Sequence, residues 1–396
     1  MYGGSQQADA AVVSAAAAIL EPPVTLPSLR AVGAERMEYA DELRSAELAI
    51  EQARYAEAAN AFSALHVPAA HHPDLALRAL LGETWARLYL GELDAALGLG
   101  IRARSFSEQQ EFGDADRADA VFRLGCVRLK RSDVALAISL FTVALELCDR
   151  SGEACDRLRA RILEWRSRGY QLRRDWRAAQ ADVERALELA QFRNDEHTLA
   201  HVLFQASLVA ERTGQTLLAC FYAEQAREIF ERVGDRQSAG RLLNNLGGLN
   251  FLLGRKEEAV EYLKRAVAAA LELDATADAA QAISSLAQVH LRSGEPDIAE
   301  SQARYALELL AGRDDFVDEI GNAQLVLGRA LAEQGRLDDA EVALAAADES
   351  FARLSSVSHR AAVWTAQGDV ARLAGDCETA ADLFRRAADA LQDFNF

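Results

Sequence analysis

The chain has 396 residues, half of them apolar, and its 61 acidic residues outnumber the 43 basic ones to give a formal net charge of −18. The apolar half excludes a wholly disordered chain, and the acidic excess argues against direct binding of nucleic acid, which needs a basic face. No apolar run is long enough to span a membrane, and five cysteines are too few for a disulfide framework. We therefore expect a cytoplasmic protein that binds neither membranes nor nucleic acid directly.

The first 35 residues differ in composition from the rest of the chain. They hold an alanine-rich stretch followed by Pro22, Pro23 and Pro27, and the first basic residue, Arg30, comes after the apolar stretch. A signal peptide would carry basic residues before that stretch. We therefore predict a flexible or partly helical tail over residues 1–35.

The remaining chain, residues 36–396, is dominated by an internal repeat. Alanine is frequent and proline is rare there, which favours an all-α fold. A small–glycine–alanine–alanine phrase recurs with gaps of 38 to 42 residues. The central alanines of the nine units are Ala58, Ala96, Ala137, Ala179, Ala219, Ala259, Ala299, Ala340 and Ala380.

Each unit reads as two antiparallel helices. Glycine stands five residues before the central alanine in six units, where it would end the first helix in the left-handed conformation. Small residues twelve positions before and seven after that alanine allow the two helices to approach closely. Large residues of the frame, such as Phe141, Leu263 and Leu344, are expected to fill the space between neighbouring pairs. A single pair has too little core, so the units should stack into one array.

This frame, clearest in Trp364, Gly368, Gly375, Ala380 and Phe384, resembles the tetratricopeptide repeat over roughly residues 38–392. The period near 40 residues is longer than is usual for that family and is similar to the repeats of kinesin light chains and of bacterial sensor regulators. Two units depart from the pattern, with Arg174 at the glycine position and Gly100 at the aromatic position. The resemblance implies a right-handed α-α solenoid of about nine helix pairs.

The resemblance also implies a site. In such arrays the first helices line a concave face that binds an extended or helical peptide, and their amide and guanidinium groups suit peptide backbone and carboxylates. Asn244 and Asn245 resemble an asparagine that clamps peptide backbone in kinesin-light-chain repeats; the alternative is a polar helix face that contacts only solvent. By position the groove residues are Arg161, Glu164, Arg168, His201, Gln205, Arg241, Asn244, Asn245, Gln281, Gln288, Asn322 and Arg329.

The fourth unit carries the densest positive charge. Eight arginines occur within 21 residues, opposed only by Glu164 and Asp175. They could receive an acidic peptide, an anionic ligand or an acidic patch of another subunit. The pattern around the helix distributes them over two sides, which favours a solvated face. The arginines are Arg157, Arg159, Arg161, Arg166, Arg168, Arg173, Arg174 and Arg177.

Catalytic and metal-binding patterns are weak. His197 and His201 have the spacing of metal ligands on a helix, but Thr198 stands where a metalloprotease needs glutamate, and no third ligand is near in the sequence. Cys148 and Cys155 fit neither a zinc site nor a redox motif and are expected to be unpaired thiols. We predict no enzyme, no metal and no cofactor.

Three functions remain open, and the first is preferred. The chain is a scaffold that holds a protein or peptide in its concave face, or the peptide-sensing module of a bacterial regulator whose output domain is missing or encoded apart, or, least favoured, an enzyme. No capping helix follows the ninth unit, and Phe394 and Phe396 stand at its end. This pattern predicts self-association through the C-terminal repeats.

Overall fold

The computed structural model describes residues 29–52, 54–66, 71–110, 112–193, 195–313, 316–354 and 356–392. These residues form α-helices joined by short turns, with one 3₁₀ turn, η2 (Gly152–Cys155), and no strand. None of the described helices is both long and apolar enough to cross a membrane. The helix α2 begins at Leu29 and thus includes residues 29–35 of the expected tail, whereas residues 1–28 lie outside the described part.

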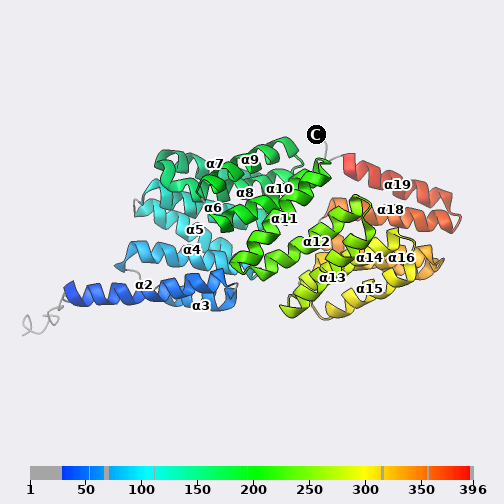
Figure 1. Cartoon of the computed structure of the whole chain (residues 1–396), viewed down its shortest axis with the longest axis horizontal. Helices are drawn as coiled ribbons and strands as arrows, with labels where there is room; N and C mark the ends of the chain where they lie inside the picture. The colour runs from blue at the N-terminus through cyan, green and yellow to red at the C-terminus, as the bar shows by residue number, and fades with distance from the viewer. Residues whose placement is uncertain are drawn as a thin grey trace, which may run out of the picture. The chain divides into compact units, whose positions relative to one another are not determined.

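The described helices form nine consecutive pairs, which confirms the all-α fold and the α-α solenoid expected from the repeat (Figure 1). They fall into two compact units, with the boundary between Phe112 and Gly113. The first unit contains α2 (Leu29–Glu51), α3 (Tyr55–Leu65), α4 (Pro73–Tyr89) and α5 (Leu93–Gln109). The second unit contains α6 (Asp114–Lys130), α7 (Val134–Ser151), α8 (Asp156–Leu172), α9 (Trp176–Phe192), α10 (Glu196–Arg212), α11 (Thr216–Val233), α12 (Arg236–Leu252), α13 (Lys256–Glu272), α14 (Thr276–Arg292), α15 (Pro296–Leu309), α16 (Val317–Glu333), α17 (Leu337–Arg353), α18 (Val357–Leu373) and α19 (Cys377–Gln392).

In the second to ninth pairs, the turn between the two helices has the left-handed residue that the glycine pattern predicts. Gly214 and Gly254, for example, have φ angles of 78° and 76°. Ser132 and Arg174 occupy the same position of the frame in two units without glycine, and they adopt the same conformation with φ angles of 66° and 58°. The turn is therefore kept even where the residue has a Cβ atom, at a local conformational cost.

The large frame residues pack inside their own pair. A Cβ atom added to Gly125 would lie 2.7 Å from the ring of Phe141, and one added to Gly328 would lie 2.6 Å from Leu344. In these two pairs the first helix carries the small residue and the second helix the large one. These side chains therefore fill the space inside the pair, and Leu263 also packs with Leu286 and Val289 of α14 in the next pair, as expected. The contact inside the pair explains why the position twelve residues before the central alanine is small.

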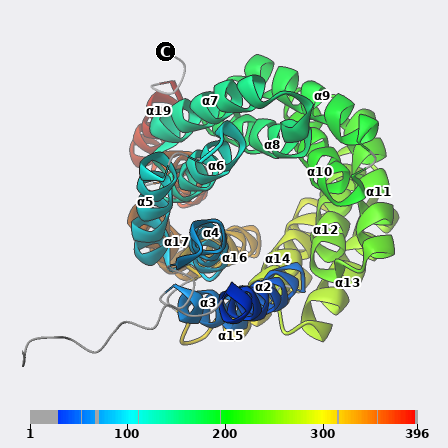
Figure 2. The same cartoon turned by 90° about the vertical axis from the view of Figure 1, so that its left-hand side faces the viewer.

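The second unit curves so that the first helices of its pairs lie on the inside. Figure 2 shows α6, α8, α10, α12 and α14 on the inner side of the turn, with α7, α9, α11 and α13 outside them. The polar side chains that the frame assigns to the first helices can therefore meet on one concave surface.

Candidate functional site

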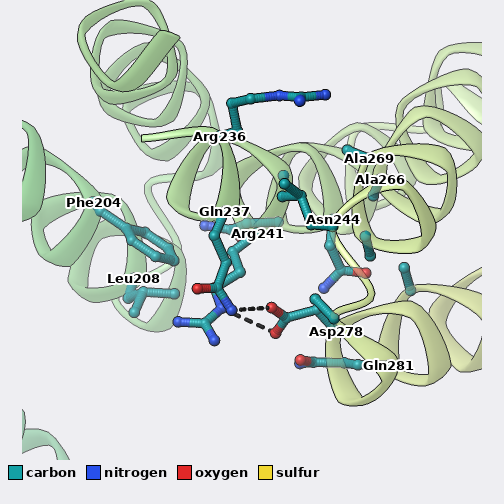
Figure 3. A pocket seen from close by; sticks show the side chains of 16 residues that line it. Phe204, Leu208, Arg236, Gln237, Arg241, Asn244, Ala266, Ala269, Asp278 and Gln281 are labelled. Carbon is teal, nitrogen blue, oxygen red and sulfur yellow. Dashed lines mark hydrogen bonds and ion pairs between the residues drawn. The ribbon is translucent and has the colours of Figure 1, made fainter. Parts of the chain in front are cut away.

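The concave side of the second unit contains a pocket of about 330 Å³. Its walls are α10, α12 and α14, and α13 forms its floor (Figure 3). Four of the residues predicted to face the groove lie together here: Arg241, Asn244, Asn245 and Gln281. Residues chosen only by their positions in the repeat thus come from two successive helix pairs and line the same pocket.

Some polar side chains of the pocket wall form hydrogen bonds within the protein, and one polar atom has no partner. Arg241 Nε and Gln237 Nε2 each donate to one oxygen of Asp278, both at 2.9 Å. Asn245 Nδ2 donates to Ser207 Oγ at 3.1 Å. Asn244 Oδ1 is buried and has no hydrogen-bond partner among the described residues. A buried acceptor without a partner costs free energy, and a ligand N–H group would remove that cost.

The floor of the pocket is made of small side chains. Ala266, Ala269 and Ala270 of α13 and Ala282 of α14 line it, and Gly240 of α12 stands opposite Ala269. Longer side chains at these positions would fill the space. An apolar floor beside a few fixed polar groups is the usual composition of a ligand pocket.

The other predicted groove residues do not share this pocket. Gln288 lines a smaller pocket of about 190 Å³ with Glu211 and Arg292. Gln205 is buried in α10. Arg329 donates to the carbonyl oxygen of Ala362 at 3.3 Å, and neither it nor Asn322 lines either pocket.

The surroundings of His201 on the inner helix α10 disfavour its charged form. Burial lowers the pKa of His201 well below its usual value, and the charges of His197, Arg168, Arg161 and Arg241 lower it further. His201 is therefore neutral at pH 7. The arginines among these neighbours come from α8 (Arg161 and Arg168) and from α12 (Arg241).

Some arginines of the fourth repeat form ion pairs and hydrogen bonds that join helices. Arg157 forms an ion pair with Asp195 of the next pair at 2.6 Å. Arg166 binds Asp182 of α9 at 2.7 Å, and Arg159 donates to the carbonyl oxygen of Cys148 in α7 at 2.9 Å. These three arginines link elements of the solenoid, so the cluster as a whole is not one site.

Arg161 and Arg168 lie instead near the inner surface. The guanidinium of Arg161 stacks 5.3 Å from the ring centroid of Phe122, and that of Arg168 lies 4.8 Å from the centroid of Trp165. Arg168 also forms an ion pair with the buried Glu164 at 2.5 Å. Aromatic rings thus support both guanidinium groups from one side.

The histidine pair has a third potential ligand that the sequence analysis missed. Ligand atoms of His197, His201 and Asp235 all lie within 4.8 Å of one another. Asp235 comes from the turn before α12, where its side chain accepts the N–H of Ser238. Burial first, and then the nearby arginine charges, disfavour a positive charge at His201, and the N-terminus of α12 adds a positive dipole that also repels a divalent cation. We therefore assign no metal to this cluster.

The two cysteines of interest are buried free thiols. Burial raises the pKa of Cys148, and the neighbouring Cys155 raises it further. A thiol with a raised pKa is a poor nucleophile and a poor metal ligand at neutral pH. This environment agrees with the expectation that both are unpaired.

Comparisons with known proteins agree on the fold. The tetratricopeptide-repeat family models match residues 207–272, 238–312 and 284–353. No curated protein sequence matches the chain significantly. Among solved structures, a Rap protein complexed with competence and sporulation factor aligns with a TM-score of 0.67 and 16% identity over 91% of this chain and 99% of its own.

Two further structures are similar over most of their length. Aspartyl phosphate phosphatase F from Bacillus subtilis aligns with a TM-score of 0.59 and 16% identity, covering 89% of this chain and 94% of its own. The Rap conjugation gene regulator of plasmid pLS20, in complex with the Phr* peptide, has a TM-score of 0.58 and 14% identity, covering 90% of this chain and 96% of its own. At these identities the likeness establishes the fold alone.

Proposed function

Since residues 207–353 are tetratricopeptide repeats within an α-α solenoid, we propose that the chain is a peptide-binding module that uses the concave face of its second unit. One observation carries the proposal. Asn244 presents a buried acceptor without a partner beside an open apolar floor, in the position where the repeat frame places groove residues. A peptide backbone N–H would satisfy that acceptor, and a side chain would fill the space above the alanines.

A short peptide suits the pocket better than a folded partner. The pocket of about 330 Å³ has room for one or two side chains, and two of the three structures compared above contain a bound factor or peptide. We therefore favour the peptide-sensing regulator over the scaffold for a folded protein. Binding of the ligand would change the curvature of the array, and this change would be transmitted to an output domain or partner.

The proposal assigns no enzymatic role to the chain. Aspartyl phosphate phosphatase F has a similar fold, so that activity needs its own test. We expect no faster loss of phosphate from aspartyl-phosphorylated receiver domains when the purified chain is added at equimolar concentration. A more than tenfold acceleration would make the chain a phosphatase and contradict this part of the proposal.

The groove is tested by affinity selection from a pool of random heptapeptides, with retained peptides identified by mass spectrometry. The double variant Asn244→Ala, Asn245→Ala should bind the selected peptides about tenfold more weakly, because each lost hydrogen bond contributes on the order of 1 kcal/mol. Gln225→Ala, on the exposed face of the outer helix α11, is the matched control and should bind as the wild type does. Equal affinity of all three proteins would place the site elsewhere.

We also propose self-association through the C-terminal repeats. Phe384 of α19 is half-buried, whereas its counterparts Phe141 and Leu344 are fully buried. Leu391 of the same helix is 38% exposed; Phe394 and Phe396 lie outside the described residues. A second copy would cover this apolar face of α19. Light scattering should show a dimer at micromolar concentration that Leu391→Asp weakens, and a 43 kDa wild-type monomer would refute the proposal.

Direct binding of nucleic acid is not part of the proposal. The net charge of −18 repels a polyanion at long range. We expect no electrophoretic mobility shift of duplex DNA at physiological salt with micromolar protein, and a shift there would overturn this expectation.

A further inference from the structure

The smaller pocket of about 190 Å³ continues the groove that holds the larger one. Residues of α10, α12, α13 and α14 line both pockets. On α12 the wall of the larger pocket runs from Arg236 to Asn245, and that of the smaller pocket from Gly248 to Leu252. On α14 the two walls cover residues 275–282 and 285–292, in the same order. The two pockets therefore follow one another along the same two inner helices.

Two glycines of α12 are not required by the packing of the helices. A Cβ atom on Gly248 would have nothing within 4 Å, and one on Gly240 would make an ordinary contact, 3.5 Å from Ala269 Cβ. Glycine inside a helix is less stable than alanine. Gly240 lines the larger pocket and Gly248 the smaller one. The space above α12 is thus kept open at both pockets at a cost in stability, and a ligand that lies against the helix backbone accounts for it.

The smaller pocket combines an apolar base with two opposite charges. Leu263 and Val289 of its lining are buried in one cluster, against which Phe251 packs. Glu211 lines the pocket from the end of α10 and Arg292 from the end of α14. Neither of these two side chains forms an ion pair or a hydrogen bond with another described residue. Both charges are therefore available to a ligand.

Opposite charges around one pocket favour a neutral, dipolar ligand group. A carboxylate bound to Arg292 would be repelled by Glu211, and an ammonium group bound to Glu211 would be repelled by Arg292. A carboxamide avoids both repulsions, because its oxygen accepts from the guanidinium group and its NH₂ group donates to the carboxylate. Asparagine and glutamine side chains carry this group on a short apolar stem that suits the apolar base.

The separation of the pockets determines the spacing of the side chains that fill them. The centres of the two walls are about ten residues apart on α12 and on α14, which is about 15 Å along a helix. An extended peptide covers about 13 Å in four residues, and side chains four residues apart point to the same side. Asn244 lies one helical turn from both Gly240 and Gly248. Its free acceptor can therefore receive a backbone N–H from the residues that connect the two side chains.

We propose that the smaller pocket is a second subsite for the same peptide, which lies extended along α12. An apolar side chain of the peptide occupies the larger pocket, and four residues away an asparagine or glutamine carboxamide binds between Glu211 and Arg292. This inference rests on the proposed peptide-binding function and adds the conformation of the ligand and the chemical class of its second side chain.

The test uses fluorescent octapeptide pools with leucine at position two and random alanine or serine at the unspecified positions. Position six is glutamine, glutamate, lysine or alanine, and a further pool has glutamine at position five. Each pool is also made in reversed sequence order, which samples both directions along α12. Fluorescence anisotropy should show that glutamine at position six binds at least tenfold more tightly than any other pool. Equal affinity for glutamine at positions five and six would overturn the extended path, and a preference for glutamate or lysine would overturn the carboxamide.

A pair of glycine variants locates the subsite. Gly248→Leu places a side chain in the smaller pocket, and it should weaken binding of the pool with glutamine at position six about tenfold while leaving the alanine pool unchanged. Gly98→Leu is the matched control, since Gly98 is also a helical glycine with nothing within 4 Å of its Cβ position and lines neither pocket. This control should bind every pool as the wild type does. Equal losses in the two variants would overturn the site.

Two charge variants test the same contact without filling the pocket. Arg292→Gln leaves Glu211 as the only charge of the two, so the lysine pool should bind at least fivefold more tightly than it binds the wild type. Glu211→Gln should produce the same gain for the glutamate pool. Unchanged preferences in both variants would show that these side chains do not contact the peptide and would overturn the proposal.

The outcomes separate the two proposals. If no pool binds the wild-type chain, the peptide-binding function itself is wrong. If the alanine pool binds and depends on Asn244, but glutamine at position six adds no affinity, the function stands and the second subsite is excluded.

Discussion

The two adjacent glycines of α12, Gly247 and Gly248, differ in the space available for a side-chain methyl group. A Cβ atom on Gly247 would lie 2.5 Å from Leu263 Cγ and 3.2 Å from the carbonyl oxygen of Ala259, whereas one on Gly248 would have nothing within 4 Å. Both positions are helical, so both replacements by alanine gain the same helix propensity. The difference in stability between the two alanine variants therefore reports how closely α12 and α13 approach each other at Gly247.

We expect Gly247→Ala to lower the free energy of unfolding by about 1–3 kcal/mol, since overpacking forces the leucine and the helix backbone to shift. Gly248→Ala should instead raise it by about 0.5–1 kcal/mol. Urea unfolding followed by circular dichroism compares the two variants with the wild type. Equal stability of the two variants would show that the small frame position is not required by the packing.

The residues of the site were predictable to the extent that they follow the frame. Arg241, Asn244 and Gln281 were assigned to one face by their offsets, and the structure places them in one pocket. Asp235 was missed because its neighbours are set by the curvature of the array and by a turn. Neither the curvature nor the turn follows from the repeat period.

Neighbouring helix pairs are joined by an ion-pair network around Glu300 of α15. Its carboxylate accepts from Arg304 of the same helix, from Arg336 at 2.8 Å and from Gln334 at 2.9 Å, the last two in the turn between α16 and α17. Hydrogen bonds, first from Arg304 and then from Gln334 and Arg336, lower the pKa of Glu300 to about 2 against the opposing effect of burial. The ionised carboxylate therefore binds one helix pair to the next.

This network predicts a pH dependence of stability. Because the folded pKa lies below the unfolded value of about 4.3, the contribution of Glu300 is fully present above that pH and is lost as the pH falls from about 4.3 to about 2. Glu300→Gln should thus be less stable than the wild type at pH 7, with a difference that shrinks on acidification below pH 4.3. Urea unfolding at pH 7, 4.5 and 3.5 measures it, with Glu341→Gln on the exposed face of α17 as control. A difference that stays constant with pH would contradict the assigned role of the carboxylate.

The helix pairs themselves were the most predictable level of the structure. Most of the second unit's helices have 17 residues, as α12 and α13 do, and two such helices with their turns give the period near 40 residues. The frame specified which helix carries the small residue. It did not specify which neighbour the large residue would meet, because positions on one helix face can contact a partner in the same pair or in the next one.

At the scale of the whole molecule, a groove ligand contacts pairs that do not otherwise touch. In a stacked array each pair packs mainly on its neighbours, so curvature is the sum of small adjustments between them. The proposed peptide contacts α10, α12 and α14 around the pocket. Binding should therefore restrict that curvature and favour one conformation of the array.

A peptide sensor and a passive scaffold consequently differ in a measurable way. At a peptide concentration of about one hundred times the Kd, binding should stabilise the folded chain by about 2.7 kcal/mol. In a sensor the same saturation should also reduce the radius of gyration in small-angle X-ray scattering, because contacts across the concave face draw the inner helices together. The Asn244→Ala, Asn245→Ala variant at the same peptide concentration controls for nonspecific compaction and should show neither effect. Thermal stabilisation with an unchanged radius of gyration would instead favour the scaffold, since the ligand would then bind a preformed groove without selecting a conformation.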